Sequence, residues 1–205
     1  MAVEPGSSDH QPRGGYVERL LAGPGVSLLL MSAVTLVALT VARASGAAGM
    51  FVLQAPLSEG VWQIPLSVFA HVGMAHLTAN AVMVLVAGGL VVLSSTVVRY
   101  HAFFLVTGAL SGIAQVVVTG LFGPPAAVLG ASGAALAFVG YLLTSNAASS
   151  WLLDRVPRWM VVTVIGACGL ALMLRYYAAG SANVGHLAGA LLGLVAGRFN
   201  LLRPS

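Results

Sequence analysis

Long apolar runs recur along this chain with almost no charge between them, and they leave few folds open to it. Of the 205 residues, 59% are hydrophobic and 7% are charged, whereas soluble domains carry about 25% charged residues. A chain with so little polar surface must have lipid as its solvent. We therefore predict an all-α integral membrane protein of six transmembrane helices, at approximately residues 26–41, 75–93, 102–121, 132–146, 159–174 and 184–202.

The segment before the first apolar run contains prolines, paired glycines and three acids. This composition is typical of a disordered segment, so we predict a cytoplasmic tail at 1–24 and one membrane domain at 25–205. A cleavable signal peptide is the alternative, because two arginines precede the run and residues 42–44 resemble a small-residue cleavage site. The length and acidity of the tail favour a retained helix.

The arginines are distributed unevenly between the two sides of the predicted bundle. With the N-terminus inside, seven of the nine lie in inner segments, namely Arg13, Arg19, Arg99, Arg155, Arg158, Arg198 and Arg203. Only Arg43 and Arg175 lie outside. Because inner loops are enriched in basic residues, this predicts cytoplasmic termini and a multi-pass protein of the plasma (inner) membrane. The spread of the arginines also argues against a nucleic-acid-binding face.

Five polar residues, among them His71, fall at one depth of the predicted bundle. His76 and Asn80 lie in the first turns of the second helix, Ser132 opens the fourth, and His186 lies near the start of the sixth. Even-numbered helices run inward from the outer face, and each residue adds about 1.5 Å along the axis. All five therefore lie in the outer third of the membrane, where polar groups mark functional sites.

The sixth predicted helix carries a stripe of small residues that includes the histidine. His186, Gly189, Gly193 and Gly197 follow spacings that place them on one face. Glycines allow two helices to approach closely, and helix packing alone would explain them. The position of His186 on the same stripe favours a function, since a neighbouring helix could bring the Ser132 hydroxyl within hydrogen-bond reach of the imidazole.

The residue inventory allows one nucleophilic arrangement. Ser132 lies between Gly130 and Gly133 at a helix start, where free backbone N–H groups can stabilise an oxyanion. All carboxylates lie outside the predicted helices, so a Ser–His dyad replaces a triad. No His-Glu-x-x-His motif and no intramembrane aspartate pair is present. We expect neither a metal nor another cofactor, although three histidines could in principle bind a metal.

Three segments resemble, in order and spacing, the signatures of the rhomboid family. They are His71-Val-Gly-Met-Ala-His76-Leu-Thr-Ala-Asn80, Gly130-Ala131-Ser132-Gly133, and Gly185-His186-Leu-Ala-Gly189-Ala-Leu-Leu-Gly193. The resemblance covers most of the chain after residue 55. It implies a six-helix intramembrane serine endopeptidase whose partners are the lipid bilayer and single-pass transmembrane substrates, cut near their outer end.

The resemblance also implies a role for each matched residue. Ser132 attacks the scissile carbonyl, and His186 takes its proton and later passes it to the leaving amine. The Ser132 backbone N–H, His76 and Asn80 hold the oxyanion, and His71 lies at the cavity mouth. Because a folded helix hides its carbonyls, a substrate must unwind at small or helix-breaking residues before it is cut.

The chain departs from the family pattern at two positions. Many relatives have Trp-Arg in the first outer loop, where this chain has Trp62-Gln63, and many have an aromatic residue stacked on the base, where this chain has Leu136. One alternative is a catalytically inactive rhomboid-like protein that binds transmembrane clients; the intact dyad argues against it. Another is a small transporter, but we find neither internal repeats nor broken midplane helices.

Overall fold

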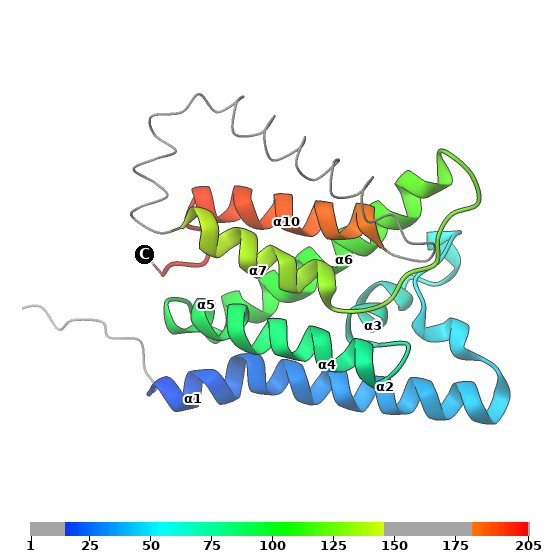
Figure 1. Ribbon diagram of the computed structural model, residues 1–205, viewed down its shortest axis with the longest axis horizontal. Helices are drawn as coiled ribbons and strands as arrows, with labels where there is room; N and C mark the ends of the chain where they lie inside the picture. The colour runs from blue at the N-terminus through cyan, green and yellow to red at the C-terminus, as the bar shows by residue number, and fades with distance from the viewer. Residues whose placement is uncertain (1–14, 146–181, 205) are drawn as a thin grey trace, which may run out of the picture.

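A computed structural model describes residues 15–145 and 182–204 of the chain. The residues it describes are helical apart from connecting loops and one isolated β-bridge, between Leu53 and Val128. Most of the predicted tail (residues 1–14) and the predicted fifth helix (159–174) lie outside the described residues. The remaining elements form a layered bundle in which α7 and α10 lie on one side and the first long helix on the other (Figure 1).

The first helix is longer than its apolar run. It comprises α1 (Tyr16–Leu20), a π turn (Leu21–Gly25) and α2 (Val26–Ser45). Residues 16–24 are therefore helical and not part of the predicted tail. Pro24 lies inside the π turn; proline lacks an N–H and its ring crowds the preceding turn, and a wider turn relieves both conflicts.

The second, third, fourth and sixth predicted helices are all present, with ends within a few residues of those predicted. They are α4, its π turn and α5 (Met74–Met83, Val84–Gly88, Gly89–Leu93), α6 (Val97–Gly120), α7 (Ser132–Thr144) and α10 (Asn183–Arg198). Within the described ranges, three helices are long and apolar enough to cross a membrane, namely Tyr16–Ser45, Met74–Leu93 and Val97–Gly120.

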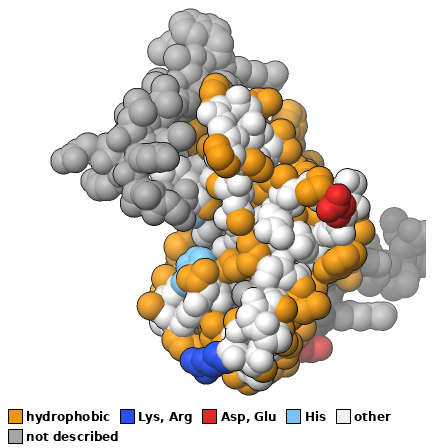
Figure 2. Space-filling model, turned by 90° about the vertical axis from the view of Figure 1, so that its right-hand side faces the viewer, with side chains coloured by type: hydrophobic (Ala, Val, Ile, Leu, Met, Phe, Trp, Pro, Cys, Tyr) orange, Lys and Arg blue, Asp and Glu red, His pale blue; other side chains and the backbone are white. Residues whose placement is uncertain are grey.

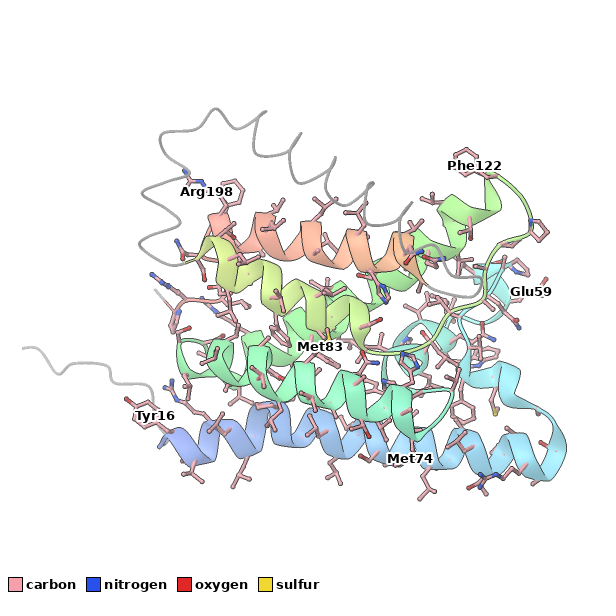
Figure 3. The ribbon with its side chains drawn as sticks, in the orientation of Figure 1. Tyr16, Glu59, Met74, Met83, Phe122 and Arg198 are labelled. Atoms are coloured by element: carbon pink, nitrogen blue, oxygen red, sulfur yellow. The ribbon has the colours of Figure 1, made fainter. Side chains whose placement is uncertain are left out.

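The helices alternate in direction, so α4, α7 and α10 begin at the same end of the bundle (Figure 1). That end also carries the loop elements Ala48–Phe51, Leu57–Glu59 and α3 (Gln63–Phe69). Glu59 and Phe122 mark this end, and Tyr16 and Arg198 mark the opposite one (Figure 3). Viewed from this end, the surface is mostly hydrophobic or uncharged, with few charged side chains (Figure 2).

Helices α7 and α10 touch through their backbones. A Cβ atom added at Gly189, Gly193 or Gly197 would overlap a carbonyl oxygen of α7, that of Gly133, Ala137 or Tyr141 respectively. The Thr144 hydroxyl also donates to the Leu194 carbonyl, with 2.8 Å between the oxygens. The predicted glycine stripe is therefore the contact that brings the start of α10 against the start of α7.

Candidate active site

Ser132 is the first residue of α7, and a fixed loop leads into it. Gly130 has φ +121° in that loop, and a Cβ there would lie 2.7 Å from Cε1 of His76. Glycine is thus required both by the backbone angle and by the histidine ring against it. The amides of the first turn of α7 have no acceptor within the helix, and no side chain caps them, so they present their partial positive charge to an incoming group.

His186 lies in the first turn of α10, and its Nε2 is 2.8 Å from the Ser132 Oγ. Both residues are half-buried. At this distance the hydroxyl donates to an unprotonated Nε2, which is the contact that general-base catalysis needs. The structure therefore brings together the two side chains that the sequence places in different helices.

Gln115 fixes the start of α10, and sequence reasoning missed it. Its Oε1 accepts the Gly185 backbone N–H at 2.9 Å, and the side chain comes from the C-terminal part of α6. The side chain is buried, with 4% of its surface exposed. A glutamine inside an apolar helix was the signal that could have found it, since polar groups in membrane helices rarely lack a partner.

Asn80 and His76 lie on α4 beside the nucleophile loop. The Asn80 Nδ2 donates to the His76 carbonyl at 2.9 Å. The Asn80 Oδ1 and the His76 Nδ1 are buried and, within the described part of the chain, have no hydrogen-bond partner. Buried polar atoms without a partner are rare and call for an explanation. The His76 ring lies against Gly130, two residues before the nucleophile, and a hydrogen on its Nδ1 could be donated to an incoming oxygen, whereas the Asn80 Oδ1 can only accept.

His71 is the residue that the resemblance places at the cavity mouth. It is buried, with 1% of its surface exposed, and its ring meets that of His76 edge-on with centroids 5.0 Å apart. Burial, and then the neighbouring His76, lower the pKa of His71 to about 4, so this ring is neutral at pH 7. No three His, Cys, Asp or Glu side chains among the described residues are placed to hold a metal ion.

A cavity of about 20 Å³ adjoins the dyad. Ser132 and His186 line it together with small or polar residues such as Ser67, Ser111 and Gly185. This volume is sufficient for about one water molecule. The polar groups on its wall make it suited to hold water beside the nucleophile.

The two departures from the family pattern have different structural outcomes. Gln63 is buried, and its Nε2 donates to the Gly49 carbonyl at 3.1 Å, so a neutral side chain ties the loop between α2 and α3 to α3. Leu136 lies one turn beyond Ser132 and is half-buried. No ring of a described aromatic residue stacks on His186, and within the described part of the chain its Nε2 meets the Ser132 hydroxyl.

We predict that Gln63→Ala loosens the loop between α2 and α3 without unfolding the bundle. The loss of one buried hydrogen bond costs about 1 kcal/mol, so limited proteolysis should cut within residues 46–62 faster than in the wild type. Gln54→Ala is the matched control, because Gln54 is an exposed glutamine in the same loop. Equal cleavage rates in the two variants would show that Gln63 does not anchor this loop.

Comparison with protein-family models matches residues 58–203 to the rhomboid domain. The match covers more than half of the chain and includes every candidate site residue named above. The chain therefore belongs to the rhomboid family, whose fold is a multi-pass membrane bundle and whose members include serine proteases. Comparison with curated proteins found no significant match.

Proposed function

We propose that this protein is an intramembrane serine endopeptidase that hydrolyses peptide bonds of single-pass membrane proteins through a Ser132–His186 dyad. The observation that carries the proposal is the 2.8 Å separation of the Ser132 Oγ and the His186 Nε2. The dyad lies at a helix start with uncapped amides, in a chain of the rhomboid family. A pair kept only for packing would not need this alignment of hydroxyl and ring nitrogen.

The reaction follows acyl-transfer chemistry. His186 removes the proton of Ser132 as Oγ attacks the scissile carbonyl, and the oxyanion is held by the Ser132 N–H, His76 and Asn80. The protonated His186 then gives its proton to the leaving amine, and the C–N bond breaks. A water molecule, activated by the same ring, hydrolyses the acyl-enzyme and restores Ser132. The cavity beside the dyad can supply that water.

The proposal includes a placement in the membrane. Six helices span the bilayer, both termini are cytoplasmic, and the site opens toward the outer side of the plasma (inner) membrane. The arginine distribution and the common starting end of α4, α7 and α10 (Figure 1) support this orientation. Substrates unwind locally near their outer end, since a helical segment keeps its carbonyls hydrogen-bonded within itself.

Reconstitution into liposomes with a single-pass model substrate tests the function. The substrate carries a glycine–serine pair near its outer end, and its matched control carries two leucines there. We expect two fragments from the first substrate and none from the second. Binding of the substrate without any cleavage would instead support a catalytically inactive, client-binding protein.

We predict that Asn80→Ala slows cleavage about 10²-fold, as for loss of one oxyanion donor. The dyad remains, so labelling by a serine-reactive probe should persist at a reduced rate. Thr78→Ala is the control, because Thr78 is exposed on the same helix. Complete loss of cleavage in a folded Asn80→Ala variant, or an unchanged rate, would contradict this role for Asn80.

A further inference from the structure

His71 is a buried, titratable side chain to which the proposed reaction gives no task. It lies between α3 and α4 with 1% of its surface exposed. Its ring nitrogens reach three other parts of the chain. Nδ1 is 3.0 Å from the Phe69 carbonyl and 3.1 Å from the Thr35 hydroxyl of α2, and Nε2 is 3.4 Å from the backbone N of Ala131.

These partners determine where the ring proton is. A carbonyl oxygen only accepts, so Nδ1 next to the Phe69 carbonyl must carry the hydrogen. A backbone N–H only donates, so Nε2 next to Ala131 must be unprotonated. The Thr35 hydroxyl, which donates to the same Phe69 carbonyl at 3.3 Å, completes the arrangement around Nδ1. His71 is therefore held as the neutral ring with its acceptor directed at Ala131.

Ala131 immediately precedes the nucleophile, and its amide is buried. The loop before it is held by backbone partners. Val128 exchanges two hydrogen bonds with Leu53 at 2.9 Å each, and the Gly130 N–H donates to the Ser67 carbonyl at 2.8 Å. Among these loop contacts, the one to Ala131 comes from a side chain, His71. A buried amide without an acceptor is costly, so loss of this ring would favour a rotation of the peptide next to Ser132.

We propose that His71 is a positioning residue that holds the Ser132 Oγ in reach of His186 through the Ala131 amide, with Thr35 fixing the ring. The inference rests on the proposed function, because it assigns His71 a task in that reaction. A nucleophile loop that is displaced by a fraction of an ångström loses rate while the fold remains intact. The effect must therefore appear in the chemical step, not in the amount of folded protein.

The test compares three substitutions that remove different atoms of the ring. His71→Phe removes both nitrogens, His71→Asn keeps a polar group near the place of Nδ1, and His71→Gln keeps an acceptor near the place of Nε2. Purified variants are labelled with a fluorophosphonate probe, and kinact and KI are measured per folded molecule. We expect kinact to fall about 10-fold in the Phe and Asn variants, with KI unchanged, and to recover in the Gln variant.

The matched control is His101→Phe. His101 is a histidine at the opposite end of the bundle that bonds to the Ala22 carbonyl at 2.7 Å, and its loss should leave kinact unchanged. If His71→Phe does not fold, Thr35→Val gives the same test through the ring's other partner. We expect kinact to fall about 3-fold for Thr35→Val, as for loss of a modest hydrogen bond, and to stay at the wild-type value for Thr35→Ser.

A second measurement tests the hydrogen bond between the Ala131 amide and His71 directly. Hydrogen exchange of the Ala131 amide, followed by NMR with paired glycine and alanine labels, should be slow in the wild type and His71→Gln. It should be about 10-fold faster in His71→Phe, since one buried bond is lost. An unchanged kinact in folded His71→Phe, equal losses in the Gln and Phe variants, or unchanged Ala131 exchange would each overturn the inference. An unlabelled wild type would overturn the proposed function, and the role of His71 with it.

Discussion

Ser132→Ala and His186→Ala should each abolish both probe labelling and substrate cleavage, while the protein still folds and inserts. Removing either member of a serine–histidine pair lowers kcat by about 10⁶-fold, because Ser132→Ala leaves no nucleophile and His186→Ala leaves Ser132 without the base that activates it. Both side chains are half-buried at the edge of a cavity, so their truncation should change the melting temperature little. In-gel fluorescence of the labelled protein, alongside cleavage of the liposome substrate, gives the readout.

The matched control for this prediction is Ser94→Ala. Ser94 follows α5 at the opposite end of the bundle, and its hydroxyl donates to the Val91 carbonyl at 3.2 Å. Labelling should be that of the wild type. Labelling that persists in Ser132→Ala would mean that another serine is the nucleophile. If the folded wild type is not labelled at all, the result would support a catalytically inactive, client-binding protein instead of a protease.

Gly193→Ala should destabilise the bundle and abolish activity, although one methyl group is added. Alanine favours a helix over glycine by about 1 kcal/mol. Against that gain, the new Cβ would overlap the Ala137 carbonyl oxygen, and forcing extra volume into a packed contact costs about 1–3 kcal/mol or more. The neighbour is backbone and cannot rotate away, so α10 must move from α7 and carry His186 out of reach of Ser132.

Thermal unfolding and probe labelling together test this expectation. Gly123→Ala is the matched control, since nothing lies within 4 Å of a Cβ added at Gly123, and it should behave as the wild type. A folded Gly193→Ala variant with the wild-type melting temperature and labelling rate would show that the two helices are not held in contact at this point.

Most of the helical frame could be predicted from the sequence because its signal is local. Apolar runs located α4, α6, α7 and α10 to within a few residues, since a lipid-facing helix must be apolar along its whole length. The N-terminal end of the first helix could not be located in this way. Gly23 and Pro24 signal a break, yet the chain continues through them as a π turn, which depends on how α2 packs and not on propensity.

Some residues of the candidate site could likewise be predicted from the sequence, and others could not. Ser132 and His186 could be paired in advance because the topology and the glycine stripe bring two helix starts to one depth. The environment of His71 could not, because its partners come from α2, the end of α3 and the loop before α7. Three segments distant in sequence must converge before that ring has a defined orientation, and no local pattern records such a convergence. Gln63 is similar, since its acceptor is a backbone carbonyl.

The contact between α7 and α10 also limits how this protein can evolve. A clash between two side chains can be relieved by shrinking either one, so a harmful substitution there can be rescued by a second substitution nearby. Where a glycine of α10 faces a carbonyl oxygen of α7, as at Gly193 and Ala137, no side chain is available to shrink. A substitution at one of these α10 glycines should therefore have no second substitution that compensates for it. Random mutagenesis followed by selection for activity should recover second-site suppressors of changes in the side-chain core, but none for changes at these glycines.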